Sequence, residues 1–215
     1  MRLGIVIAAL VCFAGVSVAA KADNFVTNPD FAPPNAYPGY GSVPDWTGTT
    51  VSGGGPGSTD FNVAGFWNNG TLPSGDTSAG FIQQDGSFST DLTGLTVGAT
   101  YTLSFLENAR QTVDCNNCGS APTLTVSVGS DDLATMTVYG VGGTNPFTSV
   151  TETFTASAIS EWLEFSSTTV GNADGAVLLS DVSVTGVTPE PSALILLGTG
   201  LLGMAGLARR RLMRS

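Results

Sequence analysis

The chain has 215 residues, with 17 Asp and Glu, 7 Lys and Arg, and no histidine, which gives a formal net charge of −10. Without histidine, a Ser-His-Asp or Cys-His catalytic relay and an imidazole metal site are excluded. Six of the seven basic residues lie close to a terminus, so Arg110 is the one cation between Asp23 and Pro191. So acidic a middle section repels phosphate backbones, which argues against nucleic acid as a partner.

The first 22 residues have the pattern of a secretory signal peptide. Arg2 precedes an apolar stretch over residues 3–18, and Ala20-Lys21-Ala22 offers an A-x-A cleavage site. We therefore predict that signal peptidase removes residues 1–22 and that the mature chain begins at Asp23. An uncleaved membrane anchor is the alternative, although the apolar run is short for a membrane span.

Residues 23–187 are enough chain for one domain with a hydrophobic core. Apolar residues recur there with a period of two, which predicts short strands. The alternating sets are Tyr101/Leu103/Phe105, Leu124/Val126/Val128, Met136/Val138, Val150/Phe154, Leu163/Phe165 and Leu178/Val182/Val184. Predicted turns separate them at Asp85-Gly86, Val97-Gly98, 129–131, Gly142-Gly143 and 172–175. Short strands separated by such turns predict an all-β, antiparallel sandwich or barrel.

Cys115 and Cys118 are the two cysteines of the predicted mature chain. Two thiols in an oxidising compartment are expected to form a disulfide. The Cys-x-x-Cys spacing also occurs in redox motifs and zinc sites, but the chain has neither a second cysteine pair nor a histidine for zinc. We predict a disulfide that pins a short loop and stabilises the fold only locally.

Three features follow one another near the C-terminal end. They are Pro189-Glu190-Pro191, the uncharged residues 192–208, and a tail over 209–215 that begins with Arg209, Arg210 and Arg211. As a helix, residues 192–208 reach roughly 25 Å, near the lower limit for spanning a bilayer. Because arginine clusters stay in the cytoplasm, the residues before this predicted transmembrane helix are expected on the opposite side of the membrane.

This arrangement over residues 188–215 resembles the PEP-CTERM sorting signal of Gram-negative bacteria that make exopolysaccharide. The resemblance implies a transient stay in the inner membrane, cleavage by an exosortase near the motif, and delivery to the cell surface or extracellular matrix. An ordinary C-terminal anchor with a chance Pro-Glu-Pro is the alternative.

A second resemblance covers residues 23–187. The segments that carry it are Asn24–Phe31, Val43–Thr47, Phe81–Gln84 with Leu92–Phe105, Phe154–Phe165 and Leu179–Val184. In this order they resemble the strands of galactose-binding-like jelly rolls. The resemblance implies a jelly-roll β-sandwich in which Trp46 is buried, and it implies a structural Ca²⁺ between the first and last strands.

The positions that match this calcium site are Asp30 and Asp181, with Asn28 as a neighbour. Ca²⁺ prefers several oxygen ligands, which suits an acidic chain without histidine. In contrast, Ala32 stands where the family usually has an acid. The alternative is that Asp30 caps a turn and Asp181 faces solvent.

Candidate ligand-binding residues follow from the chemistry of sugar recognition, which uses aromatic platforms beside polar side chains. A predicted loop over residues 32–60 contains Tyr37 and Tyr40, and a second loop contains Trp67. Asn108 and Arg110 share one strand face if the alternation continues past Phe105. Packing within the loops, and pairing of Arg110 with a carboxylate, are the alternatives.

Together these features predict a noncatalytic protein of the cell surface or matrix, with an extracellular polysaccharide as its candidate partner. A secreted hydrolase acting on glycans is the alternative function. Such an enzyme needs two carboxyl groups roughly 5 to 10 Å apart. The sequence gives no reason to choose a pair among the 17 acids.

Overall fold

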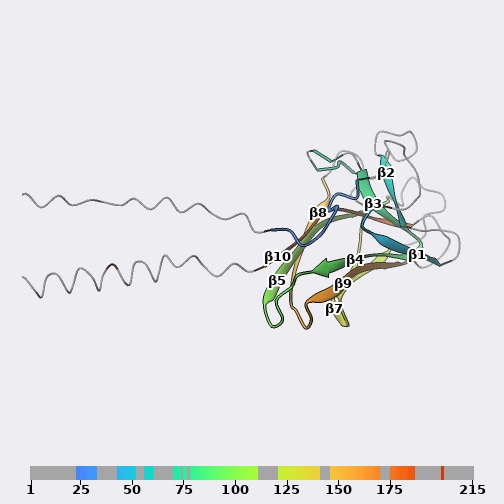
Figure 1. The fold of residues 1–215 in the computed structure, drawn as a ribbon. Coiled ribbons are helices and arrows are strands. Elements are labelled where there is room, and N and C mark those ends of the chain that lie inside the picture. The colour runs from blue at the N-terminus through green and yellow to red at the C-terminus, as the bar shows by residue number, and fades with distance from the viewer. Residues whose placement is uncertain are drawn as a thin grey trace, which may run out of the picture.

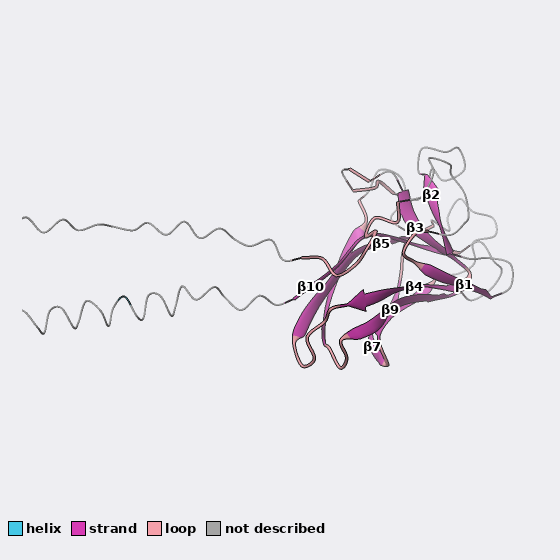
Figure 2. Cartoon of the chain, viewed as in Figure 1, coloured by secondary structure: helices cyan, strands magenta, loops and turns pink. Residues whose placement is uncertain are grey.

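The computed structural model describes residues 23–32, 43–51, 56–60, 70–73, 75–76, 78–110, 121–140, 146–169, 175–186 and 200. Apart from Gly200, strands and connecting loops make up this part of the chain (Figures 1 and 2). The strands are β1 (Thr47–Val51), β2 (Pro56–Asp60), β3 (Ser78–Gln83), β4 (Asp85–Thr93), β5 (Thr100–Ala109), β6 (Thr123–Val128), β7 (Asp131–Thr137), β8 (Thr148–Thr155), β9 (Ser160–Thr168) and β10 (Ala176–Gly186).

The strands form two five-stranded sheets, and every strand pair is antiparallel. The first sheet has the order β1-β4-β9-β6-β7 and the second has the order β2-β3-β10-β5-β8. From β3 onward the chain alternates between the sheets, except for the hairpin of β6 and β7, which is the jelly-roll pattern. The predicted all-β jelly-roll sandwich is therefore confirmed.

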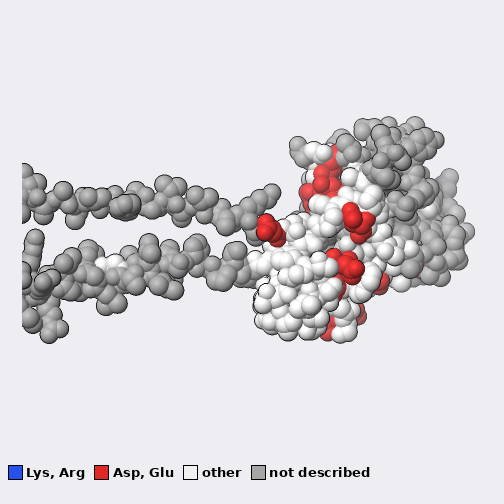
Figure 3. All heavy atoms as spheres, in the orientation of Figure 1, with Lys and Arg blue, Asp and Glu red and all other residues white. Residues whose placement is uncertain are grey.

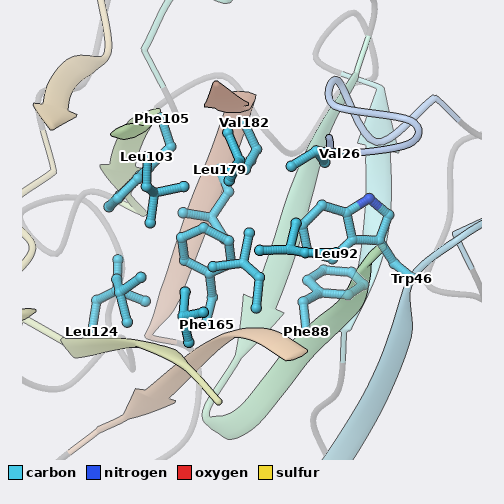
Figure 4. Close-up of a cluster of buried hydrophobic side chains, with 14 of the residues drawn as sticks. Val26, Trp46, Phe88, Leu92, Leu103, Phe105, Leu124, Phe165, Leu179 and Val182 are labelled. Atoms are coloured by element: carbon cyan, nitrogen blue, oxygen red, sulfur yellow. The ribbon is translucent and has the colours of Figure 1, made fainter. Parts of the chain in front are cut away.

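Period-two alternation places apolar side chains between the sheets. In β5, Tyr101, Leu103 and Phe105 are buried while the residues between them are partly exposed, and β6 and β9 show the same pattern. The rings of Phe105 and Phe165 meet across the sandwich with centroids 5.0 Å apart. Figure 4 shows these side chains pointing toward one another from the two sheets. Their burial supplies the main stabilisation of the fold.

An aromatic group within the same core fixes the start of the domain. Phe31 stacks on Trp46 with centroids 4.5 Å apart, and both rings lie near Phe88. Trp46 is 6% exposed, which confirms its predicted place in the core. Its indole nitrogen donates a hydrogen bond of 3.0 Å to the Asn28 carbonyl, so its polar group is satisfied.

Two sequence predictions of local structure are wrong. Asp85 and Gly86 do not form a turn but begin β4; the chain bends instead at Gln84, whose φ is 58°, and crosses from one sheet to the other. The predicted loop over residues 32–60 contains the edge strands β1 and β2. These strands are rich in Thr, Gly and Ser and lack alternating apolar residues, so periodicity did not identify them.

The predicted signal peptide lies outside the described residues, and so does the predicted transmembrane helix apart from Gly200. Among the described residues, none belongs to a helix long and apolar enough to cross a membrane. Cys115 and Cys118 also lie outside the described part, so their disulfide stays a prediction.

Candidate functional site

A groove runs over the outer face of the first sheet, where β1, β4 and β9 lie side by side. Trp162 of β9 is 52% exposed and lies opposite Asp91 of β4 in the strand register. It faces outward because its neighbours Glu161 and Leu163 point to the buried side of β9. The groove has a volume of about 420 Å³ and is lined by Thr27, Asp45, Trp46, Thr47, Ser89, Thr90, Asp91, Thr93 and Trp162. We call it the Trp162 groove.

The lining of the Trp162 groove is polar and carries no positive charge. Asp45 and Asp91 are exposed carboxylates, and several threonine and serine hydroxyls surround them. Some hydroxyls already donate to the backbone, such as Thr90 to the Asp45 carbonyl at 2.8 Å. Figure 3 shows acidic atoms but no basic atoms on the visible described surface. The groove therefore suits a ligand that donates hydrogen bonds and carries no negative charge.

A cluster of three carboxylates forms a second candidate site. Asp30 follows the opening segment, Asp76 precedes β3, and Asp181 lies in β10. One oxygen from each carboxylate lies within 4.8 Å of the others. The structure thus brings together the predicted pair Asp30 and Asp181 and adds Asp76, which the sequence analysis missed because no motif surrounds it.

Local backbone geometry explains why these acids meet. The pairing of β10 with β5 is irregular between Ser180 and Ser183, and Asp181 within this bulge has a φ of 52°. The opening segment then runs beside β10, where the Val182 amide donates to the Pro29 carbonyl at 3.1 Å. Asp30 is consequently held next to Asp181.

Mutual repulsion and partial burial perturb two of these acids. Burial, together with the neighbouring charges of Asp76 and Asp181, raises the pKa of Asp30 to about 6. Burial also raises the pKa of Asp76, although the hydrogen bond from Ser180 at 2.5 Å opposes this shift. The three carboxylates therefore repel one another at neutral pH, and a bound cation would relieve this repulsion.

The donor set fits calcium. Ca²⁺ binds oxygen ligands at 2.3–2.6 Å, so opposed ligands lie roughly 5 Å apart, comparable to the 4.8 Å limit within the cluster. The predicted neighbour Asn28 has another role: its side chain bonds the amide of Ala32 at 2.8 Å and the carbonyl of Pro44 at 2.9 Å. These bonds hold the opening turn, in which Asn28 and Phe31 have positive φ.

Two of the predicted ligand residues, Asn108 and Arg110, lie elsewhere. Asn108 is 1% exposed near the end of β5. Arg110 follows it, with its guanidinium 4.9 Å from the centre of the Phe81 ring. Both therefore belong to the second sheet, away from the sheet that carries Trp162. Tyr37, Tyr40 and Trp67 lie outside the described residues.

One more acid, Glu107, is buried with an unpartnered carboxyl oxygen. Glu107 shares the inner row of β5 with Leu103 and Phe105, and its Oε2 atom has no hydrogen-bond partner. Burial raises its pKa to about 7. The buried hydroxyl of Ser167 in β9 is likewise unpartnered.

Trp162 was not predicted from the sequence, although a signal for it exists. The alternation of Leu163 and Phe165 places residues 162 and 164 on the opposite face of the strand. A tryptophan at such an outward position is unusual, because large aromatic side chains are normally buried.

Comparison with known proteins gives one family match. Residues 187–211 match the PEP-CTERM protein-sorting motif, as the sequence predicted. No curated protein sequence matches the chain significantly.

Solved structures share the fold. The crystal structure of an apo cyclase from Fischerella sp. is 15% identical, covers 77% of this chain and 96% of its own, and has a TM-score of 0.54. A Fischerella sp. TAU cyclase in complex with 4-(1H-indol-3-yl)butan-2-one is 14% identical, covers 75% of this chain and 95% of its own, and also has a TM-score of 0.54.

A carbohydrate-binding module, TmCBM61 in complex with β-1,4-galactotriose, is 12% identical and covers 77% of this chain and 99% of its own. Its TM-score of 0.46 is too low to carry an argument about this chain. Residues 187–211 thus form a PEP-CTERM sorting motif behind the described jelly roll, and this motif indicates an exported protein that is sorted to the cell envelope or surface.

Proposed function

We propose that the protein is a noncatalytic component of the cell surface or extracellular matrix that binds a neutral polysaccharide in the Trp162 groove. One observation carries this proposal: an exposed tryptophan stands beside a carboxylate on a strand face, in a groove without cations. An indole ring offers an apolar platform to a sugar ring, while Asp45 and Asp91 accept hydrogen bonds from hydroxyl groups.

The charge of the domain narrows the class of glycan. Arg110 is the one Lys or Arg in the described part of the chain, and it lies on the other sheet. Acidic polysaccharides would be repelled by the two aspartates of the groove unless a divalent cation bridged them. The partner is therefore an uncharged exopolysaccharide.

Export and processing complete the proposal. Signal peptidase removes residues 1–22 in a Gram-negative host, residues 192–208 hold the precursor in the inner membrane, and exosortase then acts near Pro189-Glu190-Pro191. The carboxylates of Asp30, Asp76 and Asp181 bind a structural Ca²⁺, which joins the opening segment to β10.

Binding of the mature domain to a neutral exopolysaccharide tests the function. Trp162→Ala is expected to weaken binding about tenfold, since an aromatic platform contributes roughly 1–1.5 kcal/mol. Tyr139→Ala is the matched control, because Tyr139 is 72% exposed at the end of β7, outside the groove. Equal binding by wild type and Trp162→Ala would contradict the assignment of the groove.

A glycan hydrolase remains the second candidate because two carboxylates line the same groove. A hydrolase that uses a proton donor needs one carboxyl group sheltered from water, whereas Asp45 and Asp91 are both exposed. We therefore expect no release of reducing sugar from bound polysaccharide. Release that disappears in Asp91→Asn would establish the enzyme instead.

A further inference from the structure

At one end of the sandwich the two longest described loops carry no charge, although the β6–β7 hairpin at the same end carries the exposed Asp131 and Asp132. Residues 94–99 connect β4 to β5, and residues 156–159 connect β8 to β9. The wider stretches 92–106 and 153–160 contain no Asp, Glu, Lys or Arg, although the chain has 17 acids. The part of the domain at the lower left of Figure 3, where these loops lie in Figure 1, shows no acidic or basic atoms. We call these two loops the uncharged end.

Each loop presents an aliphatic side chain to solvent. Val97 is 57% exposed and Ile159 is 70% exposed. The loops also bond to each other, because the Leu95 amide donates to the Ile159 carbonyl at 3.1 Å. A second bond of 2.8 Å runs from the amide of Gly98 to the carbonyl of Ala156, so the two exposed side chains belong to one connected surface.

The loop backbones satisfy many of their own hydrogen-bond donors. The buried carboxylate of Glu161 accepts the amides of Ser157 at 2.8 Å and Ala158 at 3.2 Å. On the other loop, the Tyr101 hydroxyl accepts the Thr96 amide at 2.8 Å. Moving such a surface out of water costs little free energy, because few backbone amides lose a hydrogen bond to water.

The sorting segment begins at this same end. Gly186, the last residue of β10, pairs with Tyr101 near the start of β5, and the matched sorting motif begins at residue 187. Fully extended chain spans at most about 3.6 Å per residue, so Ser192 can lie no farther than roughly 22 Å from Gly186. If residues 192–208 cross the membrane, as the proposed function states, the uncharged end is held close to the bilayer.

We propose that the uncharged end rests on the phospholipid surface while the precursor is still anchored. An anionic membrane repels the acidic remainder of the domain, including Asp131 and Asp132 of the β6–β7 hairpin at the same end, whereas the two uncharged loops can approach it and insert Val97 and Ile159 into the headgroup region. The surface thereby sets which side of the sandwich faces the membrane when the sorting motif is processed. The proposal rests on the transmembrane assignment of the proposed function.

Photo-crosslinking of the full-length chain in vesicles of phosphatidylethanolamine and phosphatidylglycerol tests this orientation. Benzoylphenylalanine replaces Val97, Ile159 or, as a control at the opposite end of the sheet, Tyr139. We expect lipid adducts from positions 97 and 159 and none above background from position 139. Resistance to carbonate extraction reports separately whether the chain is inserted, so a soluble chain would overturn the transmembrane assignment.

A charge substitution distinguishes attraction of the two loops to lipid from simple tethering by the proposed transmembrane segment. With the crosslinker at position 159, Val97→Asp is expected to abolish the lipid adduct, while the matched variant Tyr139→Asp leaves it unchanged. If an inserted chain gives no lipid adduct, crosslinks to protein instead, or keeps its adduct in Val97→Asp, the membrane-resting surface is disproved.

Discussion

Gly80 shows how one missing side chain shapes the start of the domain. A Cβ atom at this position would lie 2.6–2.8 Å from ring atoms of Phe31, which stacks on Trp46. Gly80→Ala must therefore displace the Phe31 ring, and we expect it to destabilise the domain by about 1–3 kcal/mol. Chemical denaturation of the mature domain measures the change.

Gly186→Ala is a suitable control for this substitution. The added Cβ would meet the Tyr101 ring at 3.5 Å, which is an ordinary contact, and Gly186 also lies in a strand. We expect a change in unfolding free energy of less than about 0.5 kcal/mol. Equal losses from both variants would mean that Phe31 is free to move.

Glu107 gives the domain a pH dependence of stability. The pKa of Glu107 is about 7 in the folded state against 4.5 for an unperturbed group, so the unfolded chain loses this proton at lower pH. The contribution of Glu107 to the free energy of unfolding is therefore largest below about pH 4.5 and falls as the pH rises toward 7. After allowance for partial solvent screening, the free energy of unfolding falls by about 2 kcal/mol. Glu107→Gln should remove this part of the decline, as thermal denaturation across this range will show; an unchanged profile would contradict it.

At the scale of elements, the bulge of β10 brings Asp181 to Asp30 and Asp76. The pKa of Asp30 is about 6 against an ordinary 3.8, so the carboxylates destabilise the ion-free domain increasingly as the pH rises from about 4 to 6. The proposed Ca²⁺ would offset this repulsion. We expect chelator to lower the melting temperature at pH 7 and added Ca²⁺ to restore it, with a smaller effect near pH 4.

Asp181→Asn should abolish the response of the melting temperature to Ca²⁺, because it removes one charged ligand. Asp91→Asn is the matched control, since Asp91 is exposed in the Trp162 groove and outside the cluster. A melting curve of the wild-type domain that chelator does not change would mean that the three acids hold no ion.

Sequence periodicity predicted the strands whose two faces differ in solvation. β5, β6 and β9 have one buried face, so their apolar residues alternate and the strands could be recognised. β1 and β2 lie at the sheet edges and lack this alternation, so they were assigned to a loop. The turn predicted at Asp85 is wrong because the Asp-Gly pair lies inside β4. The residue with positive φ is Gln84, and glutamine is not a typical turn residue.

The candidate sites were predicted only in part, for a related reason. Asp30 and Asp181 lie in segments that resemble a known family, whereas Asp76 lies in a connection without such a motif and reaches the cluster only through the tertiary fold. The Trp162 groove likewise combines residues from several strands and the opening segment. Residues distant in sequence meet there through strand register, which composition and spacing do not encode.

At the scale of the whole molecule, export and sorting predict a mature protein cut at both ends. In the native host we expect loss of residues 1–22 and of the segment after Pro189-Glu190-Pro191, and intact-mass measurement of surface protein will detect both cleavages. Changing Glu190 should leave the precursor in the inner membrane. Surface protein that still carries Arg209, Arg210 and Arg211 would contradict processing by exosortase.

The position of β10 has a consequence for the timing of folding. β10 lies between β3 and β5, so the second sheet stays divided until residues 176–186 are available. These residues are among the last to be synthesised before the sorting motif at 187–211. Because such non-local strand pairing is slow and cannot precede the synthesis of its last strand, the sandwich can close only after residues 176–186 have been made. A ribosome that stops before residue 176 therefore releases a product whose second sheet lacks its middle strand, so that β3 and β5 are left with unpaired edges open to aggregation and proteolysis.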